Sequence, residues 1–335
     1  MVCGLSDNLS ARHGLFPAGG RMVFTYAVMA IITCLLLACL QESGPGPSTA
    51  LAVATDSVYS ADSVQIRYDV RGSGKYALVF IHCWSCDRTF WDEQVDEFAG
   101  DYKVVTLDLA GHGESGTARQ TWSMAAYGAD VAAVVNKLHL PNVILIGHSM
   151  GGAVMIEAAR LLGNRVVALI GVDNLQNLAQ ELTEEEIAGY LAHFAADFQT
   201  ATHEFVKTMF PAAADSALVE RVSTNMASAP ETIALGSFDQ LFHYNFVTAL
   251  RDVRVPIRCI NSDEYPTDVE ANNRVAASFK VELMPGMGHF PHMVAPERFN
   301  QLLHKTIEEF WPRQTRPPAR DQQPGSAAPE TDRET

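Results

Sequence analysis

Residues 142–156 run NVILIGHSMGGAVMI: an apolar stretch, a glycine-flanked turn and a second apolar stretch with helical spacing. The first stretch predicts a buried strand and the second the start of a helix, so the pentapeptide GHSMG at 147–151 joins a strand to a helix. Glycine is needed at both ends of this turn, because a Cβ would collide with the neighbouring backbone. The pattern indicates a nucleophile elbow, with Ser149 as the nucleophile.

Apolar runs and helical stretches alternate from Ser57 onward, which is typical of a mostly parallel sheet covered by helices on both faces. Between residues 174 and 245 the chain is rich in Glu, Ala and Phe and has no convincing strand. We expect a helical cap there, lying over the carboxyl ends of the strands, where ligands bind. The strands are predicted at 77–82, 102–107, 142–146, 166–172, 256–260 and 281–283, and the core helices at 124–138, 152–162 and 296–310.

Further motifs occur in a fixed order around the elbow. Together with GHSMGG they make residues 64–310 resemble the α/β-hydrolase superfamily, and most closely its bacterial esterase-like serine hydrolases with a helical cap. The resemblance implies an α/β-hydrolase core formed by 57–173 and 246–311, with the cap at 174–245. The motifs are His82-x-Trp84, Asp108-x-x-Gly111-His112-Gly113-x-Ser115 and Gly288-His289.

A serine hydroxyl is a weak nucleophile, so it needs a base within hydrogen-bond reach and donors for the oxyanion. His289 is the candidate base, because it lies in a glycine-rich loop after an apolar strand; His292 is the near rival but lacks the preceding Gly-x-Gly. The resemblance implies that the backbone N–H groups of Trp84 and Met150 form the oxyanion hole. The chain has Cys83 where the family usually has glycine.

A carboxylate must orient the base. Asp263 fits the family position best, since it lies just past the predicted strand 256–260. Glu264 and Asp268 are nearby alternatives, and Asp173, directly after the predicted strand 166–172, occupies another position that some family members use. Asp108 and Glu114 are interpreted as turn-stabilising carboxylates.

The N-terminal segment, residues 1–40, contains an uncharged apolar stretch at 22–40 that predicts an export signal. The residues LLAC at 36–39 resemble the lipobox of bacterial lipoproteins, which implies a lipid on Cys39 and a membrane-anchored protein of the cell envelope that faces the periplasm. An uncleaved hydrophobic anchor is the alternative, because the stretch approaches the roughly 20 residues of a spanning helix. We interpret 41–56 as a linker and 312–335 as a disordered tail.

Composition narrows the remaining possibilities. A net charge of −15 excludes electrostatic attachment to nucleic acid or to anionic lipid. Cys83-Trp84-Ser85-Cys86 has the spacing of a redox motif without the elements of a thioredoxin-like unit, so we interpret this pair as incidental, able to form a disulfide in an oxidising compartment. No metal-ligand spacing and no phosphate-binding glycine motif occurs, so no metal and no cofactor are expected.

These features predict an enzyme that cleaves a small-molecule carboxylic ester through an acyl-enzyme intermediate. The alternatives are an inactive hydrolase-like binding module and a serine-dependent thioesterase, lactonase or acyltransferase. The aromatic side chains of the predicted cap either line an apolar acyl pocket or form the cap's own core. They are Phe194, Phe198, Phe205, Phe210, Phe238, Phe242, Tyr244 and Phe246.

Overall fold

The structure is a computed structural model that describes residues 53–311. The predicted export signal, the proposed lipid site Cys39 and the tail 312–335 lie outside the described residues. Among the described residues, the helices are too short or too polar to cross a membrane.

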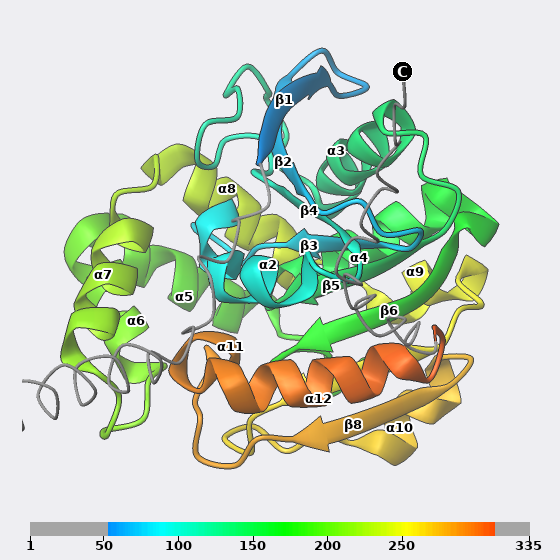
Figure 1. The fold of residues 1–335 in the computed structure, drawn as a ribbon. Coiled ribbons are helices and arrows are strands. Elements are labelled where there is room, and N and C mark those ends of the chain that lie inside the picture. Colours follow the sequence, from blue (N-terminus) through cyan, green and yellow to red (C-terminus); the bar gives the residue numbers. More distant parts are fainter. Residues whose placement is uncertain (1–52, 312–335) are drawn as a thin grey trace, which may run out of the picture. The chain divides into compact units, whose positions relative to one another are not determined.

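In the described part of the chain, eight strands form one sheet in the order β1-β2-β4-β3-β5-β6-β7-β8 (Figure 1). From β4 to β8 in this order, every neighbouring pair is parallel. The predicted fold class, a mostly parallel sheet flanked by helices, is confirmed. The strands are β1 (Ala54–Tyr59), β2 (Gln65–Arg71), β3 (Ala77–Ile81), β4 (Lys103–Leu107), β5 (Val143–His148), β6 (Val166–Val172), β7 (Ile257–Asn261) and β8 (Phe279–Leu283).

The antiparallel edge, β1 and β2, is absent from the strands predicted above. Most residues of β1 are exposed and polar, so this strand lacks the continuous apolar run that marks a strand buried on both faces. It begins at Ala54, inside the segment interpreted as a linker.

Helices cover both faces of the sheet. Alternate residues of a strand point to opposite faces: Leu78 and Phe80 pack in one apolar cluster with α2 and α12, whereas Val79 and Ile81 pack in another with α3 and α4. The two clusters hold the carboxyl edge of the sheet in place. The helices of this core are α2 (Asp92–Phe98), α3 (Met124–Lys137), α4 (Gly151–Leu162), α9 (Phe246–Ala249), α10 (Val269–Val275), α11 (Pro291–Val294) and α12 (Pro296–Glu308).

The segment between β6 and β7 is helical, as predicted. Its first helix begins with a capping box, in which Thr183 and Glu186 each accept a hydrogen bond from the other's backbone N–H. In Figure 1 the arrowheads of β6 and β8 point toward these helices, so the segment lies at the carboxyl ends of the strands. We call α5 (Glu184–Ala196), α6 (Phe198–Thr208), α7 (Ser216–Ala227) and α8 (Glu231–Phe242) the cap.

The Asp108 motif stabilises a turn. Asp108 is buried, and its carboxylate accepts the backbone N–H groups of Arg88 and Glu114, both at 2.8 Å, as well as the Arg88 guanidinium. A Cβ on Gly113 would lie 2.3 Å from the same carboxylate, so the turn requires glycine there. The structural interpretation of this aspartate is therefore confirmed.

Candidate active site

Ser149 lies in the sharp turn between β5 and α4. Its φ of 53° is in the left-handed region, a conformation that costs about 1–3 kcal/mol for a residue with a side chain. A Cβ on Gly147 would lie 2.3 Å from the carbonyl oxygen of Gly151, and one on Gly151 would lie 2.7 Å from that of Ile81. The glycines are therefore required as predicted, and the fold stores backbone strain at the predicted nucleophile.

The carboxylate that contacts His289 is Asp173. His289 Nδ1 and Asp173 Oδ2 are 2.6 Å apart, and only 2% of the Asp173 side chain is exposed. Asp263, the predicted partner, is exposed and instead accepts the backbone N–H of Gly286 at 2.7 Å. The prediction of Asp263 is corrected to the alternative Asp173. Asp263 connects the loop after β7 to the loop that bears His289.

The other two alternatives also make no contact with the imidazole. Asp268 caps α10 by accepting the backbone N–H of Ala271 at 2.8 Å. Glu264 is exposed at the edge of the cavity described below. Both carboxylates lie past β7, as Asp263 does.

The sheet order explains this correction. β6 is the parallel neighbour of β5, and Val172 is in register with His148. The residue after each strand therefore lies beside the other, and Ser149 N–H donates to the Val172 carbonyl at 3.1 Å. Asp263 follows β7, which is one strand farther from the serine. Sequence spacing alone does not reveal which strand is adjacent to the elbow.

Asp173 is held as an ionised acceptor. Burial raises the pKa of this carboxyl group, but the hydrogen bond and charge of His289, together with the Ser262 N–H at 2.8 Å, outweigh burial and lower the pKa overall. A carboxylate on Nδ1 holds the proton on that nitrogen. Nε2 is then the nitrogen free to accept a proton.

The backbone of His289 is fixed on both sides. Its N–H donates to the Met209 carbonyl at 2.8 Å, which attaches the loop to the end of α6 in the cap. Its carbonyl oxygen lies 2.7 Å from Nε2 of His148, the residue before the nucleophile. Gly288 has a φ of 64°, and a Cβ there would lie 2.4 Å from the Met209 carbonyl oxygen. The predicted Gly-x-Gly signal thus reflects a close approach of the loop to the cap.

The two residues predicted to supply the oxyanion donors lie in turns at the carboxyl edge of the sheet. Met150 precedes the first turn of α4, and Trp84 lies in the turn after β3. β3 and β5 are parallel neighbours with Ile81 in register with Gly147, so the two turns lie at the same edge of the sheet. Within residues 53–311, neither N–H donates a hydrogen bond. Both remain available to an anion at the positive end of α4.

Ser149, Asp173 and His289 line one cavity of about 630 Å³. The cap supplies an apolar wall, including Phe205, Phe242 and, just past α8, Tyr244. The segment between β6 and α5 contributes neutral amides to the lining, and no Lys or Arg of the described residues lines the cavity. The lining residues include Asn174, Gln176, Asn177, Gln180, Met209, Leu241, Phe246 and Tyr265.

The cap aromatics divide between the two roles expected for them. Phe205, Phe242, Tyr244 and Phe246 line the cavity. The others are buried in the apolar core that joins the cap to the sheet: Phe194, Phe198, Phe210 and Phe238.

Four histidines around the site are buried, and burial lowers their pKa. The pKa of His82 falls to about 4, that of His112 and His292 to about 3, and that of His148 well below its usual range. His82 accepts the Leu109 N–H on Nε2 at 2.9 Å, which fixes it as the neutral Nδ1–H tautomer. These four imidazoles are therefore uncharged at neutral pH and pack around the site as neutral groups.

Acid is therefore expected to destabilise the fold. The unfolded chain, with histidine pKa near 6.5, binds more protons than the folded chain between about pH 6.5 and pH 3, so stability is full above this window and is lost as pH falls through it. Each histidine contributes up to about 1.4 kcal/mol per pH unit. Burial also raises the pKa of Asp108 and Asp130, which offsets part of the loss.

Urea unfolding at constant ionic strength measures this effect. We expect the free energy of unfolding to fall by on the order of 5 kcal/mol from pH 7 to pH 5. His112→Gln should flatten the dependence, whereas the exposed His193 offers a control, His193→Gln, that should leave it unchanged. A free energy of unfolding that is constant from pH 7 to pH 5 would contradict the buried neutral histidines.

The mostly parallel sheet, the strained serine turn and the Asp173–His289 contact define an α/β-hydrolase. Residues 78–302 match the model of the Alpha/beta hydrolase family, and the chain belongs to this family.

Curated relatives and solved structures agree with this assignment. The chain is 25% identical over 255 residues to the pimeloyl-(acyl-carrier protein) methyl ester esterase of Yersinia enterocolitica, covering 71% of this chain and 96% of that protein. It is 31% identical over 154 residues to the dihydrolipoyllysine-residue acetyltransferase component of the acetoin cleaving system of Pseudomonas putida. That match covers 46% of this chain and only 40% of the relative's length. An esterase structure from Exiguobacterium antarcticum has a TM-score of 0.70 at 19% identity, over 76% of this chain and 100% of that one.

Proposed function

We propose that this enzyme hydrolyses a carboxylic ester through an acyl-enzyme on Ser149. The observation that supports the proposal is the 2.6 Å contact between Asp173 and His289, on the same cavity as the strained Ser149. A carboxylate on Nδ1 of an imidazole leaves Nε2 to act as the general base for a serine. The esterase relative from Yersinia enterocolitica, which the chain matches over 96% of its length, supports the same reaction class.

The proposed reaction has two halves. Ser149 Oγ attacks the ester carbonyl, its proton passes to His289 Nε2, and the N–H groups of Trp84 and Met150 stabilise the oxyanion. The C–O bond to the alcohol then breaks, and His289 returns the proton to the leaving alkoxide. In the second half His289 takes a proton from water as the water oxygen attacks the acyl carbonyl. The C–O bond to Ser149 then breaks, His289 returns this proton to Ser149 Oγ, and the carboxylic acid is released.

A fluorophosphonate probe tests the proposal. Attack by Ser149 forms an O–P bond and expels fluoride, so the wild-type chain should be labelled at this serine and should hydrolyse p-nitrophenyl esters. A folded wild type that is neither labelled nor active would favour the inactive binding module. Faster turnover of thioesters or lactones than of matched esters would instead indicate that the substrate is a thioester or a lactone.

The lining of the cavity predicts the kind of ester. The apolar cap wall and the absence of Lys and Arg favour a neutral substrate with a small to medium apolar acyl group. Leu241 on α8 lines this wall, so Leu241→Trp should fill part of the acyl space. We expect kcat/KM for p-nitrophenyl octanoate to fall about tenfold while that for the acetate changes little, because discrimination between acyl chains is worth about 1–3 kcal/mol per methylene.

The matched control is Leu161→Trp, since Leu161 is 59% exposed on α4 and does not line the cavity. It should leave both esters unaffected. An equal loss for acetate and octanoate in Leu241→Trp would mean that this wall does not hold the acyl chain.

A further inference from the structure

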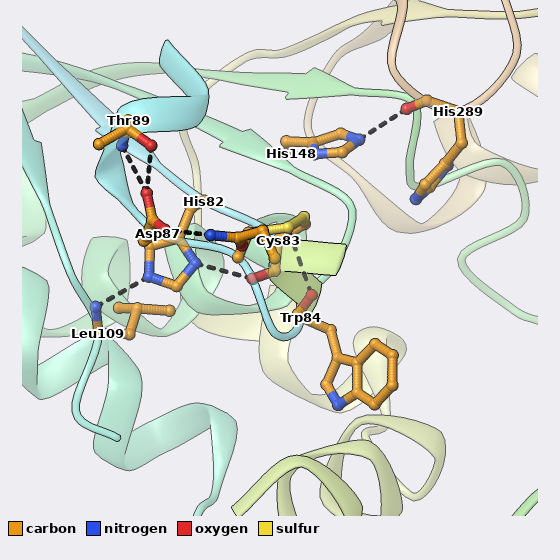
Figure 2. The surroundings of a disulfide bond; sticks show 10 residues. His82, Cys83, Trp84, Asp87, Thr89, Leu109, His148 and His289 are labelled. Carbon is orange, nitrogen blue, oxygen red and sulfur yellow. Dashed lines mark hydrogen bonds between the residues drawn. A yellow bond between two sulfur atoms is a disulfide. The ribbon is translucent and has the colours of Figure 1, made fainter. Parts of the chain in front are cut away.

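A disulfide closes the turn after β3. Cys83 and Cys86 are joined, their Cα atoms are 5.3 Å apart, and both residues are buried (Figure 2). The pair interpreted above as incidental is therefore a structural element. Between the two cysteines lie Trp84, which carries the predicted oxyanion N–H, and Ser85, whose φ of 56° is in the left-handed region.

Hydrogen bonds to the Cys83 carbonyl hold the first half of this turn. Because His82 accepts the Leu109 N–H on Nε2, its Nδ1–H donates to the Cys83 carbonyl at 2.7 Å (Figure 2). The Cys86 N–H donates to the same carbonyl at 3.3 Å. The Cys83 carbonyl and the Trp84 N–H belong to one planar peptide group, so these hydrogen bonds also set the direction of the Trp84 N–H. The disulfide holds Cys86, the donor of one of them, against Cys83.

The side chain of Trp84 is held by the cap. Its ring stacks on Phe238 with centroids 4.5 Å apart, and its indole N–H donates to the Ala234 carbonyl at 2.8 Å. Cys86 Sγ lies 3.4 Å from the Trp84 carbonyl oxygen, a packing contact because a disulfide sulfur has no hydrogen to donate. The side chain and the carbonyl are thus both engaged, and the N–H is left free.

We propose that the Cys83–Cys86 disulfide is a positioning element that orients the Trp84 N–H toward the oxyanion. This inference rests on the proposed function. Cys83 does not line the cavity, so its side chain occupies the disulfide and not the acyl space. The cross-link restricts the peptide that follows it, at the position where the family usually has glycine.

The expected kinetic effect follows from the stage of the reaction at which the Trp84 N–H acts. Negative charge on the substrate oxygen develops in the transition state, so a misaligned N–H lowers kcat more than it raises KM. Loss of a whole oxyanion donor costs about 10²–10³ in kcat, and a loosened donor should cost less. We expect opening of the disulfide to lower kcat about tenfold and to change KM less than about twofold.

The first test compares two variants of the full chain. Cys83→Ser/Cys86→Ser removes the disulfide, and Cys259→Ser replaces a buried cysteine that is free. On p-nitrophenyl butyrate, the double variant should show the loss in kcat and should bind a trifluoromethyl ketone analogue of this ester about tenfold more weakly; Cys259→Ser should match wild type in both. A double variant with lower Tm but unchanged kcat and analogue affinity would assign the disulfide to stability alone and overturn the proposal.

Chemical reduction gives a second measurement if the double variant does not fold. Tris(2-carboxyethyl)phosphine breaks the S–S bond to two thiols and is itself oxidised to the phosphine oxide with oxygen from water. Wild type and Cys259→Ser, assayed folded after alkylation confirms reduction, should both lose about tenfold in kcat. Unchanged kcat after confirmed reduction would overturn the proposal, as would finding both cysteines free in the unreduced protein.

The outcomes separate this inference from the proposed function. If fluorophosphonate does not label the folded wild type, the proposed function fails. If wild type is labelled and active, yet reduction leaves kcat unchanged, only the positioning role fails. A disulfide persists in an oxidising compartment, so this inference is compatible with export, which stays a prediction from residues 22–40.

Discussion

Ser149→Ala is expected to lower kcat for ester hydrolysis by a factor on the order of 10⁵–10⁶, because no other group can form the acyl-enzyme; removal of a serine nucleophile has effects of this size in serine hydrolases. The residual rate would come from the oxyanion donors and substrate binding. Steady-state kinetics on p-nitrophenyl butyrate, with fluorophosphonate labelling of the same preparation, measures the loss.

The variant should remain folded. Alanine pays the same left-handed backbone cost at φ 53° as serine, so Tm should change little. Ser228→Ala is the matched control, since Ser228 is an exposed cap serine that donates to the Asn225 carbonyl. Ester hydrolysis at the wild-type rate in Ser149→Ala would end the serine mechanism.

Asp173→Asn is expected to lower kcat by about 10³–10⁴. The amide nitrogen or oxygen replaces the carboxylate beside His289 Nδ1, so the imidazole is no longer held in the tautomer with a free Nε2, and the imidazolium loses its stabilising charge. Because Asp173 is buried and also accepts the Ser262 N–H, circular dichroism and Tm should accompany the kinetics.

Asp263→Asn is the matched carboxylate control. The asparagine oxygen can still accept the Gly286 N–H, so kcat should fall less than about threefold. Comparison of Asp173→Asn with Asp263→Asn shows directly which carboxylate orients His289. A large loss in Asp263→Asn with activity retained in Asp173→Asn would restore the prediction from sequence and refute the assignment from the structure.

The elbow could be predicted from sequence because its constraints are local. Gly147 is forced by the backbone of Gly151 within the same turn, and the flanking apolar runs mark the strand and the helix. The contact that forces Gly151, with the Ile81 carbonyl on β3, is not local, although the glycine itself is part of the recognisable motif. His289 could be predicted because glycines precede it in its loop, although the contact that excludes a Cβ on Gly288 is with Met209 at the end of α6. The cap could be predicted from a long helical pattern that interrupts the alternation of strands and helices.

The antiparallel edge of the sheet was not predicted. β1 and β2 are antiparallel strands with few fully buried residues, and the pairing of β2 with β4 brings together segments far apart in the chain. β1 has no apolar pattern that distinguishes it from a polar linker. In β2, however, Ile66, Tyr68 and Val70 alternate with polar residues, a period-two signal of a strand that the prediction missed. The bond between Cys83 and Cys86 was equally ambiguous, because the spacing permits a disulfide without requiring one.

The sequence by itself thus determined the fold class, the turn that bears Ser149 and the loop that bears His289, because patterns of residues close together in the chain mark each of them. Only the tertiary structure decided which carboxylate contacts that histidine, because this depends on the order of strands in the sheet. Asp173 and Asp263 both follow buried parallel strands, and sequence position does not separate them. Asp173 contacts His289 because β6 lies beside β5, which places the end of β6 next to Ser149.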